Sequence, residues 1–147
     1  MVHVRKVLYP TDFSTYSNQA YFHAMALAET HDAVLSLVFV YNPGIEGGTR
    51  AWWRDQLERL TPANPDIAVQ HVFLEGDPAG EIVRHAAEAG IDMIVMGTHG
   101  RTGVDRLLMG SVAERVLRDA PCSVLVIKLP RVHPVADRPT VLAKSAM

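Results

Sequence analysis

The sequence predicts an α/β domain built on a parallel, doubly wound β-sheet with helices on both of its faces. Short apolar segments alternate along the chain with longer segments of helical character. The apolar segment at residues 33–41 is nearly uninterrupted, as expected for a strand that is covered on both faces. Because parallel strands are joined by right-handed crossovers, the helices between them are expected to cover both faces.

Five strands and four helices are expected, and local signals delimit several of them. Pro10 closes the first strand and Ser14 is a plausible cap for the first helix. Asp77 as N-cap, Pro78 at the first helical position and Gly90 at the C-terminal stop define the third helix. In chain order the expected elements are a strand at residues 4–9, a helix at 15–30, a strand at 33–41, a helix at 51–60, a strand at 67–74, a helix at 78–89, a strand at 91–96, a helix at 111–119 and a strand at 123–129.

Length, charge and cysteine content narrow the class of protein. The 147 residues suit one domain, expected at residues 1–130, and the proline-rich residues 131–147 are interpreted as a flexible or surface-docked C-terminal extension. A net charge of -2 argues against nucleic acid as a partner. No apolar segment reaches the roughly 18 to 20 residues that span a bilayer, so no membrane association is expected. The single cysteine, Cys122, is interpreted as a buried structural thiol, and a cytoplasmic location is expected.

A glycine-rich loop follows the fourth expected strand and leads to the fourth expected helix. In a doubly wound sheet the fourth strand lies beside the first, and ligands bind outside the carboxyl ends of the strands at this switch point. The strand ends at residues 9–12 and 96–97 would therefore face each other. The helix that begins near Ser111 would present unpaired amides and the positive end of its dipole there. The sequence thus predicts an anion site in which Gly97, Gly100 and residues 110–112 cradle a phosphate chain.

A second interpretation of the loop needs no ligand. Residues 111–114 have the Ser-x-x-Glu pattern of a capping box, so Ser111 could serve only as a helix cap. Glycines after a strand are also common in ordinary loops. The loop lacks the lysine-containing pattern of a P-loop and the Gly-x-Gly-x-x-Gly pattern of dinucleotide-binding domains. The residues alone leave both interpretations open.

The spacing of the loop glycines resembles a known family motif. Gly97-x-x-Gly100, nine residues and then Gly110-Ser111 is similar to the ATP-binding motif of the universal stress protein (UspA-like) family. Residues 6–14, 76–79 and 120–126 resemble the opening strand, the third-helix start and the closing strand of that family, in the same order. The resemblance covers residues 3–129.

The resemblance implies a strand order of 3-2-1-4-5, a homodimer formed through the fifth strands, and an ATP site. It places Pro10, Thr11 and Asp12 at the adenosine, Val40 at the adenine pocket and residues 96–97 at the ribose. It also implies that Mg²⁺ or Mn²⁺ is held mainly by phosphate oxygens and water. The complete set of expected nucleotide-binding residues is Pro10, Thr11, Asp12, Val40, Met96, Gly97, His99, Gly100, Arg101, Gly110, Ser111 and Val112.

Four further side chains have two interpretations each. His99 could donate to a phosphate or accept a phosphoryl group, but a histidine that bonds the loop backbone is the preferred interpretation. Arg101 could neutralise the triphosphate or be a solvated surface residue. Trp52 and Trp53 could cover the nucleotide or a dimer surface, with core packing as the default expectation.

The leading functional hypothesis is an ATP-binding regulator of the stress response, dimeric and nucleotide-dependent, with an unknown downstream protein partner. A slow ATPase or a phosphoryl or nucleotidyl transferase using the same pocket is the first alternative. No catalytic residue is assigned, because the sequence offers no general base with charge-stabilising groups beyond His99 and Arg101. A nucleotide-free dimerisation scaffold is the second alternative.

Overall fold

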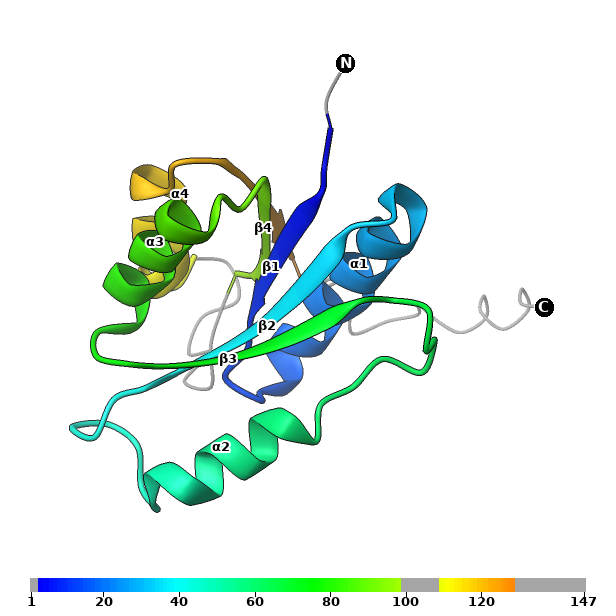
Figure 1. Ribbon diagram of the computed structural model, residues 1–147. Helices are drawn as coiled ribbons and strands as arrows, with labels where there is room; N and C mark the ends of the chain where they lie inside the picture. The colour runs from blue at the N-terminus through cyan, green and yellow to red at the C-terminus, as the bar shows by residue number, and fades with distance from the viewer. Residues whose placement is uncertain (1–2, 99–108, 129–147) are drawn as a thin grey trace, which may run out of the picture.

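The computed structural model describes residues 3–98 and 109–128, and these form the expected five-stranded parallel sheet in the order β3-β2-β1-β4-β5 (Figure 1). Its elements are β1 (Lys6–Pro10), α1 (Thr15–His31), β2 (Val34–Tyr41), α2 (Arg50–Glu58), β3 (Val69–Glu75), α3 (Pro78–Ala89), β4 (Met93–Gly97), α4 (Ser111–Asp119) and β5 (Ser123–Ile127). The fold class and the strand order predicted from the sequence are confirmed. The proposed extension at residues 131–147 lies outside the described residues.

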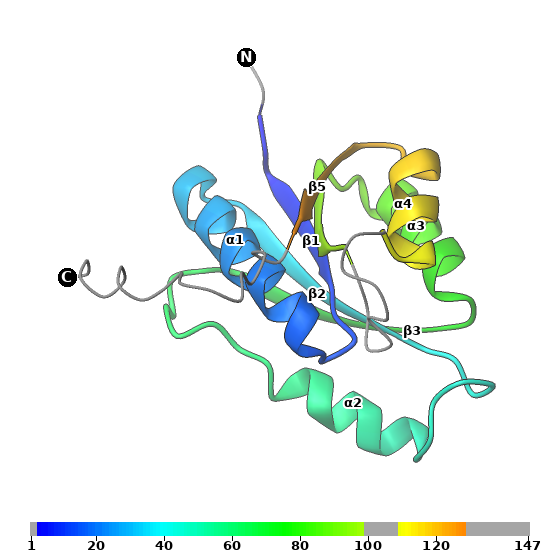
Figure 2. The ribbon, with the colours of Figure 1, turned by 180° about the vertical axis from the view of Figure 1, so that it is seen from behind.

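Two helical layers enclose the sheet. Helices α1 and α2 cover one face, and α3 and α4 cover the other, as the two opposite views show (Figures 1 and 2). The side chains of β2 alternate between these layers: Leu37 and Phe39 belong to the core beneath α1 and α2, and Val38 and Val40 belong to the core beneath α3 and α4. This burial on both faces explains the uninterrupted apolar sequence of β2.

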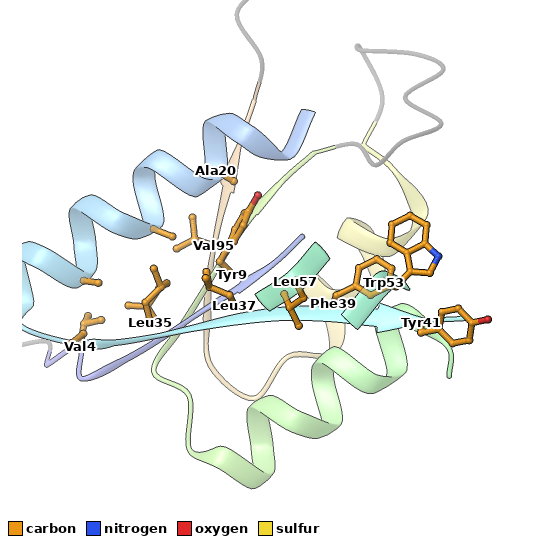
Figure 3. Close-up of a cluster of buried hydrophobic side chains, with 14 residues drawn as sticks. Val4, Tyr9, Ala20, Leu35, Leu37, Phe39, Tyr41, Trp53, Leu57 and Val95 are labelled. Atoms are coloured by element: carbon orange, nitrogen blue, oxygen red, sulfur yellow. The ribbon is translucent and has the colours of Figure 1, made fainter. Parts of the chain in front are cut away.

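The core beneath α1 and α2 contains an aromatic stack (Figure 3). Phe39 lies nearly parallel to Trp53, with ring centroids 4.8 Å apart, and Phe13 packs against both rings. The default expectation of core packing therefore holds for Trp53, which is buried. It does not hold for Trp52, which is 52% exposed and meets Trp53 edge to face.

Helix α3 begins and ends at the residues expected from the sequence. The Asp77 side chain accepts a hydrogen bond from the Gly80 amide at 2.9 Å, Pro78 occupies the first turn, and Gly90 adopts a left-handed conformation with φ 67°. The strand ends differ by one or two residues from the sequence expectation. Pro10, expected to close the first strand, is its last residue, because the ladder continues to the Thr11 amide, which donates to the Val38 carbonyl at 2.8 Å.

The topological switch point has the expected geometry. Strand β1 pairs on one side with β2 and on the other with β4, all in parallel. The carboxyl ends of β2, β1 and β4 therefore lie side by side at one edge of the sheet, between the amino ends of α3 and α4. None of the helices in the described part of the chain combines the length and the apolar character needed to cross a membrane.

Candidate nucleotide site

A cavity of about 430 Å³ opens at the carboxyl ends of β2, β1 and β4. Its volume is within the range of typical small-molecule sites. Nine of the twelve residues expected from the sequence lie in described segments, and all nine line this cavity. The lining residues are Pro10, Thr11, Asp12, Val38, Phe39, Val40, Ile45, Glu46, Pro78, Ile82, Met96, Gly97, Thr98, Gly110, Ser111, Val112 and Ala113. The other three expected residues, His99, Gly100 and Arg101, lie outside the described residues.

The turn after β1 is held by its own side chains. The Thr11 hydroxyl accepts from the Phe13 amide, and the Asp12 carboxylate accepts from the Ser14 amide, both at 2.9 Å. Phe13 has a left-handed backbone with φ 64°, which is uncommon for a bulky residue. Its ring is anchored on the opposite face of the sheet by Phe39 and Trp53. The aromatic core thus helps to fix the position of Thr11 and Asp12 at the cavity.

Strand β4 and the start of α4 form a second wall of the cavity. The Gly110 amide donates to the Thr98 carbonyl at 2.7 Å, so the end of β4 and the start of α4 lie side by side. Gly110 is the N-cap of α4, and its carbonyl accepts from the Glu114 amide at 3.0 Å. Ser111 is therefore the first helical residue. The interpretation of Ser111 as the cap of a capping box is wrong, because Gly110 occupies the N-cap position.

The hydrogen bonds at the start of α4 indicate which backbone amides could bind an anion. The Gly110 amide already has a partner, so Gly110 contributes a bare Cα rather than a donor. The amides of Ser111, Val112 and Ala113 belong to the first helical turn, where no intrahelical acceptor exists. The helix dipole adds a positive partial charge at the same place. The arrangement provides an anion-binding wall.

The apolar wall around Val40 contains residues that were not predicted from the sequence. Val38, Ile82 and Pro78 extend the apolar surface around Val40. Val38 could have been found from its alternation with Val40, and Pro78 and Ile82 from the helix that follows β3. Ile45 and Glu46 lie in the connection between β2 and α2, and no sequence motif indicated that this connection folds back to the cavity.

The sequence itself matches a known family. A model described as the universal stress protein family matches residues 3–128. The chain belongs to that family. A universal stress protein of Methanocaldococcus jannaschii is 36% identical over 142 residues, which cover 86% of this chain and 84% of that relative.

Solved structures of the family have the same fold. UspA from Lactobacillus plantarum superposes with a TM-score of 0.72 at 22% identity, over 87% of this chain and all of that one. A universal stress protein crystallised in complex with cAMP superposes with a TM-score of 0.68 at 26% identity, over 86% of this chain and 98% of that one. The resemblance noted in the sequence is confirmed at the level of family and fold.

Cys122 of this universal stress protein is half-buried. Burial raises the pKa of its thiol, and the negative charge of Asp92 acts in the same direction. The burial expected for Cys122 is thus only partial, and it disfavours the thiolate, which is the nucleophilic form.

An ion pair joins the amino ends of α3 and α4 beside the cavity of this universal stress protein. The Arg115 guanidinium donates to Asp77 Oδ2 at 2.8 Å, and the same carboxylate caps α3. The hydrogen bond from the Gly80 amide is the main reason why the pKa of the Asp77 carboxyl lies below its ordinary value of 3.8. Desolvation opposes this effect, and Arg115 lowers the pKa further. Both side chains are about half exposed, so the pair contributes at most about 1 kcal/mol.

We expect Asp77→Asn to alter the acid dependence of stability. Because the folded-state pKa of Asp77 is depressed, its stabilising contribution is present above pH 3.8 and is lost as the pH falls through the lower folded value. Asparagine still caps the helix but does not titrate. The difference in unfolding free energy between the native protein and the variant, measured by urea titration, should therefore narrow below pH 3.8. A difference that is independent of pH would contradict the lowered pKa of Asp77.

Proposed function

We propose that the cavity binds ATP and that the protein acts as a nucleotide-dependent dimeric regulator in the stress response. The observation that carries this proposal is the combination of two unlike walls in one cavity. The first turn of α4 offers amides suited to phosphates, and the β2 side offers the apolar surface of Val40 and Ile82 suited to a base. A nucleotide has the same two-ended character.

The phosphate chain is proposed to lie against α4. The amides of Ser111, Val112 and Ala113 would donate to phosphate oxygens, and the bare Cα of Gly110 would permit close approach. The exposed Ser111 side chain also lines the cavity, and its hydroxyl would add a further donor. His99, Gly100 and Arg101 remain proposed members of this wall on the basis of the motif alone.

The adenosine is proposed to lie across the end of β1, with the base toward Val40. Asp12 and Thr11 line the middle of the cavity, and Met96 and Gly97 line it on the β4 side, where the ribose would lie. The similar structure solved in complex with cAMP supports an adenine nucleotide as the ligand class. Its ligand carries a single phosphate, so the preference for a triphosphate rests on the glycine motif.

Magnesium or manganese is proposed to accompany the nucleotide. Over residues 3–98 and 109–128, no group of three or more His, Cys, Asp or Glu side chains could hold a metal ion. Magnesium usually retains water and binds through substrate phosphates rather than through a protein cage. The described residues therefore fit an ion that arrives with the phosphates, and its role would be to neutralise their charge.

Dimer formation is proposed to occur through β5. Among the described residues this strand pairs with β4 alone, so its other edge would offer backbone donors and acceptors to a second chain. Leu125 of β5 is partly exposed at this edge, and Leu117 of α4 is also exposed. A second copy of the chain would cover both the polar edge and such apolar side chains.

The proposal is tested by mass spectrometry of small molecules released from freshly purified protein, together with calorimetric titration of ATP in the presence of Mg²⁺. Bound adenine nucleotide or micromolar affinity is the expected result. Continuous phosphate release would favour the slow ATPase instead. Absence of adenine nucleotide in both measurements would reject the proposal and favour a nucleotide-free scaffold, whose dimer would still be detected by analytical ultracentrifugation.

A further inference from the structure

The connection between β2 and α2 contributes two residues, Ile45 and Glu46, to the cavity wall. The amides of Ile45 and Glu46 both donate to the Asn42 carbonyl, at 2.9 and 2.8 Å, and the Gly44 amide donates to Asn42 Oδ1 at 3.0 Å. This tight turn reverses the chain just after β2 ends at Tyr41. Ile45 and Glu46 thereby line the same cavity as Val40.

The far end of the connection is fixed by two aromatic side chains. The Trp53 indole Nε1 donates to the Gly47 carbonyl at 2.7 Å, and the Tyr41 hydroxyl donates to the Gly48 carbonyl at 3.4 Å. Both rings belong to the core beneath α1 and α2. Ile45 and Glu46 are therefore held on a short segment that is anchored on both sides, which is a suitable support for ligand selection.

Ile45 offers an apolar surface and Glu46 offers hydrogen-bond acceptors, and a nucleobase can use both. Ile45 is 69% exposed, which is unusual for a large apolar side chain in a cavity wall, and a flat base packed on it would cover that surface. Glu46 is half-buried and presents a carboxylate. An ionised carboxylate only accepts hydrogen bonds and has about four acceptor sites, so it can serve a ligand in addition to a protein contact.

The charge of Glu46 suits the base better than the phosphates. Glu46 belongs to the connection that follows β2, the strand that carries Val40, and both residues line the cavity. A carboxylate beside a triphosphate would repel it, whereas a carboxylate at the base end can accept from a base. The exocyclic amine of adenine is a hydrogen-bond donor, whereas the oxygen at the same position of a 6-oxopurine is an acceptor.

We propose that Glu46 is a specificity-determining residue that accepts a hydrogen bond from the exocyclic amine of adenine, with Ile45 covering a face of the base. This inference rests on the proposed function, because it assigns the base end of the same cavity. It makes the connection after β2, rather than the glycine loop, the segment that selects among purine nucleotides.

The test compares two ligands that differ only at the amine. ATP and purine riboside 5′-triphosphate, which lacks the exocyclic amine, are titrated calorimetrically with Mg²⁺ into the full chain. Because both carry the same triphosphate, the ratio of their dissociation constants removes the general effect of a charge change on affinity. We expect the native protein to bind ATP about tenfold more tightly than the analogue.

Three variants test whether Glu46 causes the expected difference in affinity between the two ligands. Glu46→Ala should bind both ligands equally, and Glu46→Gln, which keeps an acceptor oxygen, should retain an intermediate preference. Glu58→Ala removes an exposed carboxylate of α2 that does not line the cavity, so it should keep the native ratio. Circular dichroism of each variant checks that it is folded.

The outcomes separate this inference from the proposed function. Equal affinities in the native protein, or a preference for ATP that persists in Glu46→Ala, would overturn the role of Glu46 while nucleotide binding stands. Failure of the native protein to bind either triphosphate would reject the proposed function and this inference together. A preference that disappears only in Glu46→Ala supports the inference.

Discussion

A leucine in place of Gly110 is expected to abolish nucleotide binding, with a loss in affinity of at least about 100-fold. Gly110 lies in the cavity wall at the N-cap of α4, where we propose that phosphates approach the main chain. A four-carbon side chain there would occupy the phosphate position and separate the ligand from the first-turn amides, each of which contributes roughly 1.5–3 kcal/mol to a charged acceptor. Calorimetric titration of ATP measures the loss.

The same substitution should leave the fold nearly unchanged. Gly110 has φ -69° and ψ 159°, an ordinary extended conformation that any residue can adopt. The hydrogen bond that its backbone amide donates to the Thr98 carbonyl does not involve the side chain. Ala87→Leu adds the same side chain at an exposed position of α3 outside the cavity and serves as the matched control. ATP affinity in Gly110→Leu equal to that of the control would contradict the proposed phosphate position.

The fold could be predicted from the sequence because its signals are local and agree with one another. The apolar sequence of β2 reports burial on both faces, and Asp77 and Gly90 mark the two ends of α3 by capping chemistry. Several site residues could be predicted for a related reason. In a parallel sheet the carboxyl ends of neighbouring strands meet at one edge, so identifying the strands also brings Asp12 and Met96 to one cavity.

The parts that could not be predicted depend on tertiary bonds. The Ser-x-x-Glu pattern allowed Ser111 to be the cap, but Gly110 occupies that position, and its amide is bonded to the Thr98 carbonyl. No local pattern reports a bond between residues twelve positions apart. Glu46 reaches the cavity because Asn42 nucleates a turn and Trp53 fixes Gly47. Such a turn is compatible with many sequences, so the specificity residue was not visible beforehand.

The largest expected loss of stability follows from Phe39→Ala. Phe39 is 1% exposed and lies at the centre of the aromatic stack, with ring centroids 4.8 Å from Trp53, 5.3 Å from Phe13 and 6.0 Å from Phe73. Truncation removes the contacts of β2 with the turn after β1, with α2 and with β3 at once. Replacing a buried phenylalanine by alanine typically costs about 3–5 kcal/mol.

Urea unfolding in the absence of nucleotide measures the free energy change of Phe39→Ala. Phe22→Ala is the matched control, because Phe22 is 63% exposed on α1 and its removal should change the unfolding free energy by no more than about 0.5 kcal/mol. Comparable losses in the two variants would contradict the assignment of the stack as a central part of the core. Because Phe13 packs on Phe39 and holds the left-handed backbone that follows Asp12, folded Phe39→Ala should also bind ATP more weakly. Because Phe39 also lines the cavity, this loss would combine its direct contribution to the cavity wall with its support of the turn that carries Asp12.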